Sequence, residues 1–235
     1  MIPYIIINGV SSRTINGLIV QSLPPITKPR IRTSIEEIDG RDGDVVTTLG
    51  YGAYDKSMTI GLKGDYNIDD VIKYFDSSGK ITFSNEIDKY YKYSIYDAIN
   101  FEKLIRFKTA NVNLHCQPFK FSLIEPPKKV TPTNAITSID IRNSGNYFSK
   151  PKLTITGNGI INVYVNDVLI LAISLNSQTI IIDAESMNAT DASGNYLNRS
   201  VAGNYEDLRL QPGINNLRVT GTTTKIIVEN FSRWI

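Results

Sequence analysis

Hydrophobic and polar residues alternate with a period of two along most of this chain. That period is typical of β-strands with one buried face, because neighbouring side chains on a strand point in opposite directions. The pattern therefore predicts a mainly β protein. The segments that carry it are 58–63, 91–95, 110–117, 153–155, 161–165 and 179–182.

One segment follows the period of a helix instead. Residues 68–75 place apolar side chains at positions i, i+3, i+4 and i+7, and acidic residues occupy the first turn. Asn67 is a suitable N-cap, and Gly79 stands where such a helix would end. We expect one short amphipathic helix packed against a sheet, followed by a strand over residues 80–83.

Two sites in the second half of the chain predict tight turns. Asn166 and Asp167 separate two strand segments, and both residue types tolerate positive φ, which favours a two-residue hairpin. Pro212 and Gly213 suit the centre of a type II turn before a strand at residues 216–219.

A proline-rich segment divides the chain. Three prolines within residues 126–132 remove backbone donors, so we expect no sheet to run through residues 125–133. The 235 residues are enough for two cores of ordinary size. We therefore predict two domains: residues 1–128 form a β-sandwich or split barrel with one short helix, and residues 133–235 form an all-β sandwich.

Charge and composition narrow the class of protein. Residues 1–130 carry 17 Lys and Arg against 15 Asp and Glu, and residues 131–235 carry eight of each, so neither half is a nucleic-acid-binding arm. A single cysteine rules out an intramolecular disulfide framework. The first nine residues lack a basic leader, and no segment approaches the roughly 18–20 apolar residues of a membrane span. We expect a protein made in a cytoplasm, with no contact to a membrane.

The residues that could support catalysis are few. His115 is the only histidine, and alternation points it away from Cys116, so the two cannot form a nucleophile–base pair. The same two residues are too few for an ordinary zinc site. Asp183, Glu185 and Asp191 could supply carboxylates, but nothing in their spacing distinguishes them from surface residues. We predict that the protein is not an enzyme, with no catalytic residue, no metal ligand and no cofactor.

Two further clusters invite a binding interpretation. Residues 39–44, Asp-Gly-Arg-Asp-Gly-Asp, fail the spacing of an EF-hand calcium loop and are predicted to form a tight, solvated turn between two strands. Tyr90, Tyr91, Tyr93 and Tyr96 could stack on sugars, but alternation places Tyr91 and Tyr93 on one face of a strand, which favours packing in a core or interface.

The order of the motifs resembles a known family, the distal tail proteins (Dit) of siphophages that infect Gram-positive bacteria. The resemblance spans nearly the whole chain, although each motif alone is weak. The motifs are Ile7-Asn8-Gly9, Gly17-Leu18-Ile19-Val20, Gly40-Arg41-Asp42-Gly43-Asp44, the helix at 68–75, residues 79–84, Lys89-Tyr90-Tyr91, Cys116-Gln117-Pro118-Phe119-Lys120-Phe121, Asn143-Ser144-Gly145, residues 151–155, Leu210-Gln211-Pro212-Gly213-Ile214-Asn215 and Gly221.

The resemblance implies a structural protein of the virion, located in the tail tip. It implies that residues 1–128 form a homohexameric ring and that residues 133–235 form a galectin-like or carbohydrate-binding-module-like sandwich. The ring would join the tail tube protein above to the tip protein, and to a receptor-binding protein, below. It would leave a channel through which DNA passes without sequence-specific contacts, which agrees with the balanced charge. Residues 39–44 and 56–64 are candidate elements of the interface between subunits.

Three alternatives remain at this point. The second domain could be a carbohydrate-binding module that contacts cell-wall polysaccharide, although its Tyr164, Tyr196 and Tyr205 are scattered along the sequence. The chain could be another structural protein of a tail tube or tail tip. It could also be a wall hydrolase, which the absence of a nucleophile motif disfavours.

Overall fold

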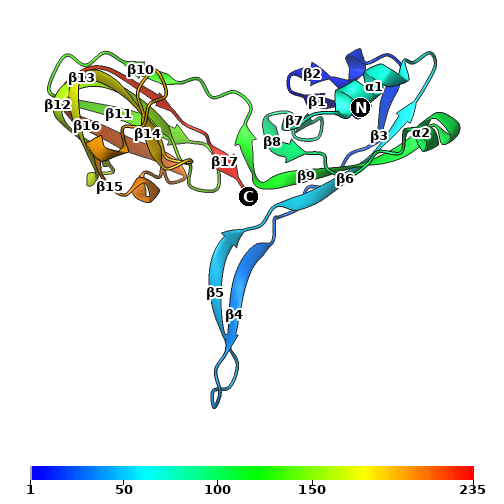
Figure 1. Cartoon of the computed structure of the whole chain (residues 1–235), viewed down its shortest axis with the longest axis horizontal. Coiled ribbons are helices and arrows are strands. Elements are labelled where there is room, and N and C mark those ends of the chain that lie inside the picture. The colour runs from blue at the N-terminus through cyan, green and yellow to red at the C-terminus, as the bar shows by residue number, and fades with distance from the viewer. Residues whose placement is uncertain (1) are drawn as a thin grey trace. The chain divides into compact units, whose positions relative to one another are not determined.

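The computed structural model describes residues 2–235 and divides them into two compact units. The first unit extends to Leu123, and the second comprises Ile124–Trp234. Strands dominate both units (Figure 1), which confirms the mainly β fold class.

The first unit is built on a single antiparallel sheet whose strands follow the order β2-β1-β7-β8-β9-β6-β3. Two helices, a 3₁₀ turn and a separate pair of strands complete it. Its elements are β1 (Ile5–Ile7), β2 (Val10–Ser11), η1 (Ser12–Thr14), β3 (Leu18–Ser22), β4 (Ile31–Glu37), β5 (Asp44–Tyr51), β6 (Tyr54–Leu62), α1 (Ile68–Phe75), β7 (Gly79–Phe83), β8 (Lys89–Ser94), α2 (Phe101–Phe107) and β9 (Thr109–Ser122).

The helix predicted over residues 68–75 is α1, and it begins as expected. The Asn67 side chain accepts a hydrogen bond from the backbone N–H of Asp69 at 3.0 Å, as an N-cap does. The helix ends at Phe75, and Gly79 is the first residue of β7, so this glycine starts the next strand instead of ending the helix.

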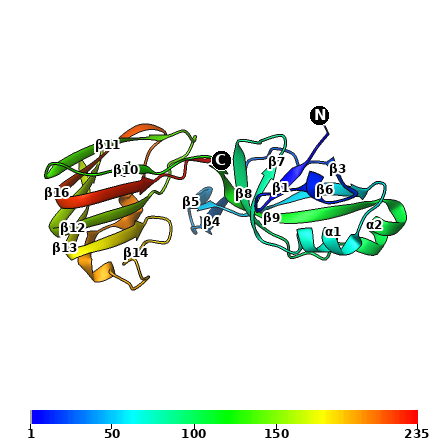
Figure 2. The same cartoon turned by 90° about the horizontal axis from the view of Figure 1, so that it is seen from above.

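A second helix, α2, adds to the single helix expected from the sequence. It has only seven residues, too few to show a clear helical period. Its local signals are an N-cap, where Asn100 accepts from the backbone N–H of Lys103 at 2.7 Å, and the left-handed residue Lys108 at its end. Both helices lie on the same side of β9 (Figure 2) and bury Val71, Phe75 and Leu104 in the core of the unit.

The second unit is a sandwich made by three long strands that each pass through both layers. The first half of β16 pairs with β11, as in Leu217↔Ile139, and its second half pairs with β10, as in Ile227↔Lys129. The elements are β10 (Lys128–Val130), β11 (Ile136–Asn143), β12 (Lys152–Val165), β13 (Val168–Asp183), β14 (Asn188–Thr190), η2 (Asn198–Ser200), β15 (Val201–Gly203), η3 (Tyr205–Asp207), β16 (Gly213–Glu229) and β17 (Arg233–Trp234).

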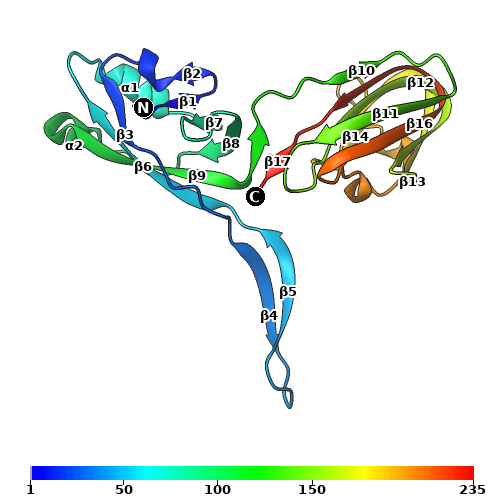
Figure 3. The same cartoon turned by 180° about the vertical axis from the view of Figure 1, so that it is seen from behind.

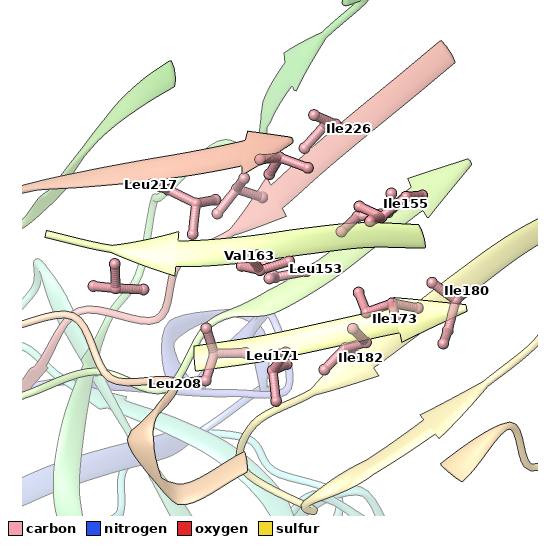
Figure 4. Close-up of a cluster of buried hydrophobic side chains, with 14 of the residues drawn as sticks. Leu153, Ile155, Val163, Leu171, Ile173, Ile180, Ile182, Leu208, Leu217 and Ile226 are labelled. Carbon is pink, nitrogen blue, oxygen red and sulfur yellow. The ribbon is translucent and has the colours of Figure 1, made fainter. Parts of the chain in front are cut away.

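The shared strands turn from one layer to the other at irregular positions near glycines. The pairing of β12 with β13 shifts register between Gly157 and Gly159, and Gly221 of β16 has a φ of 116°. A side chain at Gly221 would meet the Ile160 carbonyl oxygen, so this crossing needs glycine. The alternating apolar side chains of the three strands then face each other across the core (Figure 4).

The hairpin turn of the second unit agrees with the sequence. Asn166 and Asp167 have φ values of 50° and 67°, which is the two-residue hairpin predicted between β12 and β13. Gly213 has the positive φ expected of it, 101°, but it is already the first residue of β16 and pairs with Asn143, so the predicted type II turn stays a prediction.

The expectation that no sheet runs through residues 125–133 was wrong. Strand β10 lies in this segment and pairs with β16, as in Lys129↔Ile227. Pro127 and Pro132 flank the strand without interrupting it, and β10 is an edge strand that needs hydrogen-bond donors on one side only.

The first residues of the second unit are hydrogen-bonded to its last residues. The Glu125 carboxylate accepts hydrogen bonds from the Asn230 side chain at 2.6 Å and from the Ser232 backbone and hydroxyl at 2.7 Å each. Asn230 and Ser232 are buried, so the polar atoms of this last segment are satisfied by the first residues of the same unit.

Candidate functional site

The most unusual feature of the first unit is a two-stranded ribbon formed by β4 and β5. The two strands pair only with each other, from Ile31↔Tyr51 at the root to Glu37↔Asp44 at the tip. Figures 1 and 3 show the ribbon extending away from the sheet and helices of the unit. Two strands without further packing are marginally stable in water, so the ribbon lacks most of the contacts that stabilise strands elsewhere in the chain.

The ribbon exposes a cross-strand pair of apolar side chains. Ile35 and Val46 lie opposite each other, with 59% and 58% of their surfaces exposed. Ile31, Ile38 and Leu49 are also exposed. Side chains of this size on an unpaired ribbon are typical of a surface that another chain covers.

Charge is separated along the ribbon. The root carries Lys28, Arg30 and Arg32. The tip carries the carboxylates of Glu36, Glu37, Asp39, Asp42 and Asp44, with Arg41 as its one cation. All these side chains are exposed, and within residues 2–235 none of the tip carboxylates forms an ion pair.

The tip itself is the turn predicted at residues 39–44. Gly40 and Gly43 have φ values of 80° and 77°, which allow the chain to reverse between the two strands. The turn is solvated, as expected from its sequence. Whether it contacts another subunit stays a prediction.

The segment that leads into the ribbon is tied to the sheet by a buried lysine. The Lys56 ammonium group donates a hydrogen bond to the Pro25 carbonyl oxygen at 2.8 Å, and only 3% of the residue is exposed. It lies 5.1 Å and 5.0 Å from the ring centres of Tyr54 and Tyr91. Burial lowers the pKa of Lys56. This contact fixes one strand of the ribbon at its root.

A second buried pair lies beside Lys56. The Lys120 ammonium group is 2.7 Å from a carboxylate oxygen of Glu86, and the other oxygen accepts a hydrogen bond from the Tyr91 hydroxyl at 2.5 Å. Burial and this bond to the Glu86 carboxylate raise the pKa of Tyr91. The polar groups beneath the root are thus paired with one another.

The position of residues 56–64, the other candidate interface element, is different. Most of the segment belongs to β6, which is hydrogen-bonded to β9 on one side and β3 on the other. β9 occupies one edge of β6 from Tyr54 to Gly61, whereas β3 occupies the other edge only from Thr59 to Leu62. The part of the segment from Thr59 to Gly61 is therefore hydrogen-bonded on both edges.

The face of the central sheet that points away from the core is polar and largely uncharged. It consists of hydroxyl and amide side chains from three adjacent strands. Thr109 donates a hydrogen bond to Gln21 at 2.9 Å, and Thr59 donates to Asn111 at 3.3 Å. The polar sheet face comprises Gln21, Ser57, Thr59, Thr109, Asn111 and Asn113.

Ionisable groups appear at one end of this polar sheet face. His115 Nδ1 lies 2.8 Å from a carboxylate oxygen of Asp55, and the Tyr96 ring lies 5.5 Å from the imidazole. Asn113 donates to Asp97 at 3.0 Å, and the side chains enclose a small hollow of about 170 Å³. The prediction that His115 points to the polar side of its strand is confirmed.

Cys116 points the opposite way, into the core. It is fully buried, and burial raises the pKa of its thiol to about 12. A neutral, buried thiol is not a nucleophile, so the separation of His115 from Cys116 agrees with the sequence prediction.

The carboxylates considered in the second unit are occupied by local structure. Asp183 accepts hydrogen bonds from the backbone N–H groups of Glu185 and Ser186. Glu185 lies in the turn that follows β13 and is 3.4 Å from Arg233. Asp191 accepts from residues of its own turn, which lowers its pKa.

Three of the four clustered tyrosines are packed as predicted, whereas Tyr96 is exposed. Tyr91 and Tyr93 are core residues, and Tyr90 stacks on Phe121 on the opposite face. In the second unit the Arg218 guanidinium lies 3.9 Å over the Tyr164 ring, and the Tyr205 hydroxyl donates to Asn198. The exposed Tyr196 is therefore left as the open aromatic ring of the three considered for sugar binding.

Within residues 2–235 no cluster of three or more His, Cys, Asp or Glu side chains is suited to a metal ion. Among the helices of the same residues, none is long and apolar enough to cross a membrane.

Comparison with known proteins identifies the fold. No family model matches the chain, and no curated protein matches its sequence. Among solved structures the chain is similar to the Dit (gp 19.1) protein of SPP1, a paradigm of the hub adsorption apparatus in Gram-positive infecting phages. The TM-score is 0.66 at 17% identity, with 100% of both chains covered.

A chain of the phage P2 baseplate, in its activated conformation with Ca, is also similar. The TM-score is 0.51 at 10% identity, and 100% of this chain and 99% of that chain are covered. The chain thus has the fold of these phage hub and baseplate proteins along its whole length, which confirms the fold expected from the resemblance.

Proposed function

We propose that this protein is a structural subunit of a phage tail tip, a distal tail hub whose copies close into a ring between the tail tube and the tip. The first unit forms the ring, and the second unit projects from it as a galectin-like sandwich. The protein acts through its interfaces and carries out no reaction.

The observation that carries this proposal is the ribbon of β4 and β5. A pair of strands with exposed apolar side chains gains little from folding on its own in water. In a cyclic assembly each subunit offers one surface to the neighbour on one side and a different surface to the neighbour on the other side. The ribbon is suited to such a contact because it extends beyond the body of its own subunit and can be covered by the next copy.

The polar sheet face supports a role as a channel lining. Phosphate groups bind to lysine and arginine side chains, and such contacts slow the movement of DNA along a protein. Hydroxyl and amide side chains offer no such charge. A ring that turns this face inward would let DNA pass without holding it, in agreement with the near-neutral composition.

The partners follow from the proposed place in the tail. The ring would stack on the tube protein above and hold the tip protein, with a receptor-binding protein, below. The similarity to hub and baseplate proteins supports a position at the tail tip of the virion.

The test is the mass of the full chain in solution, followed by imaging of the same species. A particle of six times 26.2 kDa with a central hole would support the proposal. A monomer at all concentrations, combined with failure to bind purified tail tubes, would contradict it.

The alternatives retain less support. For a carbohydrate-binding module, the aromatic face of Tyr164 is already covered by Arg218. Pull-down of the full chain by host cell-wall material would favour that alternative, and a zymogram on peptidoglycan would reveal a wall hydrolase. Polymerisation into long tubes instead of single rings would identify a tube protein.

A further inference from the structure

Two lysines lie directly opposite each other on strands β7 and β8. Lys80 and Lys92 are register partners, and both side chains are exposed. Their neighbours Ile81, Tyr91 and Tyr93 point into the core, so the two lysines point away from it. Like charges directly opposite each other destabilise a sheet.

The aromatic rings beneath these lysines fix where the charges lie. The Lys80 ammonium group is 4.6 Å from the centre of the Tyr90 ring, and the Lys92 ammonium group is 4.8 Å from that of Phe121. The two rings stack on each other at 5.5 Å. Cation–π contacts of this kind hold both charges side by side. We call Lys80, Lys92, Tyr90 and Phe121 the lysine patch.

The lysine patch has no acidic partner in its own subunit. Within residues 2–235 neither Lys80 nor Lys92 forms an ion pair, whereas the neighbouring Lys89 and Lys120 pair with Asp88 and Glu86. The structure thus holds two like charges together and leaves both unneutralised. A partner of negative charge would remove the repulsion.

We propose that the lysine patch receives the acidic ribbon tip, residues 36–44, of a second copy of this chain. This inference rests on the proposed ring and names the surface on which its ribbon ends. The tip carries five unpaired carboxylates and the exposed apolar side chain of Ile38, which together match two ammonium groups beside aromatic rings. Complementary charge of this kind also fixes which surfaces meet and in which order.

The location of the lysine patch gives a second reason for this contact. Lys92 lies on the same face of the sheet as Ser94, His115 and the polar sheet face, because each of these residues is next to a core residue on its strand. Free ammonium groups on that face would bind DNA phosphates. A docked acidic tip neutralises them and leaves a face that DNA can pass.

The experiment compares charge reversals in the full chain. The patch variant is Lys80→Glu with Lys92→Glu, and the tip variant is Asp42→Lys with Asp44→Lys. The matched control is Lys103→Glu with Arg106→Glu on α2, which changes the charge of the first unit by the same amount as the patch variant. Thermal unfolding of each variant shows that the fold is kept, and mass photometry over a dilution series measures assembly.

We expect the patch variant and the tip variant each to raise the dissociation constant of the assembly by about tenfold or more, and the control to leave it within about twofold. A chain that carries both reversals should regain most of the lost affinity. Assembly of the patch variant or of the tip variant alone should depend less on salt concentration than assembly of the wild-type chain.

Three outcomes would overturn the inference. Rings that form normally with the patch variant would show that the tip binds elsewhere, while the proposed function stands. Rescue of the tip variant by Arg30→Glu with Arg32→Glu would place the tip on the root of the next ribbon. Binding of short duplex DNA by wild type, lost in the patch variant, would make the patch a DNA contact.

A wild-type chain that never assembles, alone or on tail tubes, is a different result. It would contradict the ring itself. In that case, a mixture of an Asp42→Cys chain with a Lys92→Cys chain should form no more disulfide-linked dimer than a mixture of an Asp42→Cys chain with a Lys103→Cys chain.

Discussion

The sandwich of the second unit and the ribbon of the first are made from the same antiparallel hydrogen bonds, but they differ in what covers them. In the sandwich, Ile155 and Leu171 are fully buried between two layers. In the ribbon, Ile35 and Val46 are more than half exposed. A ladder of hydrogen bonds contributes little net free energy without burial, so the buried core stabilises the sandwich, whereas the ribbon gains little from its own hydrogen bonds.

The largest expected effect lies in the sandwich. Leu153→Ala removes a fully buried side chain that packs between both layers, and we expect a loss of about 2–5 kcal/mol in the free energy of unfolding of the second unit. Urea titration followed by circular dichroism of the full chain measures it. Ile35→Ala in the ribbon is the control and should change this value by less than about 0.5 kcal/mol.

Alkaline pH should destabilise the first unit more than the second. Burial raises the pKa of Cys116 to about 12 and also raises the pKa of Tyr54, Tyr74 and Tyr91, all in the first unit. These groups ionise near pH 9–10 when the chain unfolds, so their contribution to stability is complete below that pH and is lost as the pH rises.

For Cys116 alone the loss is about 1.4 kcal/mol per pH unit between pH 9 and 12. Chemical denaturation at pH 8 and pH 10.5 should therefore show a fall in the stability of the first unit and a much smaller one in the second, where Tyr205 is the tyrosine with a raised pKa. Cys116→Val should reduce the slope, and equal slopes in both units would contradict the assignment.

A smaller effect is expected at the root of the ribbon. Lys56→Met keeps the aliphatic stem but removes the donor to the Pro25 carbonyl oxygen, at a cost of about 1–2 kcal/mol. Hydrogen exchange of residues 23–30 should become faster, while exchange in the second unit stays the same. Lys63→Met, on the surface of the following turn, is the matched control.

The smallest effect on stability, and a large one on assembly, is expected at the exposed apolar pair of the ribbon. Ile35→Thr with Val46→Thr keeps β-branched side chains and should change the free energy of unfolding by less than about 0.5 kcal/mol. Ring formation measured by mass photometry should drop sharply. Unchanged ring formation would show that this pair is not covered in the assembly.

The elements that the sequence predicted are those in which local signals agree. In α1 a helical period, an N-cap and an acidic first turn coincide. The strands β9, β12 and β13 alternate over long stretches because one face of each is buried. The prolines around β10 led to a wrong prediction, because they favour a break in the sheet although an edge strand lies between them.

The candidate surfaces could be predicted only in part. The acidic turn at residues 39–44 is visible in the sequence, but its place at the end of a ribbon is not, because exposure depends on which strands find partners. The lysine patch depends on the register of β7 with β8 and on the approach of Phe121 from β9, and no local pattern encodes those long-range pairings.

The passage of β12, β13 and β16 through both layers has a mechanical consequence. All three strands belong to one curled sheet and each runs from one layer into the other, so the layers cannot slide or separate as independent bodies. The second unit should therefore unfold as one body under load, and not one layer at a time. A module at the end of a phage tail would meet such load whenever the particle is tethered to a surface.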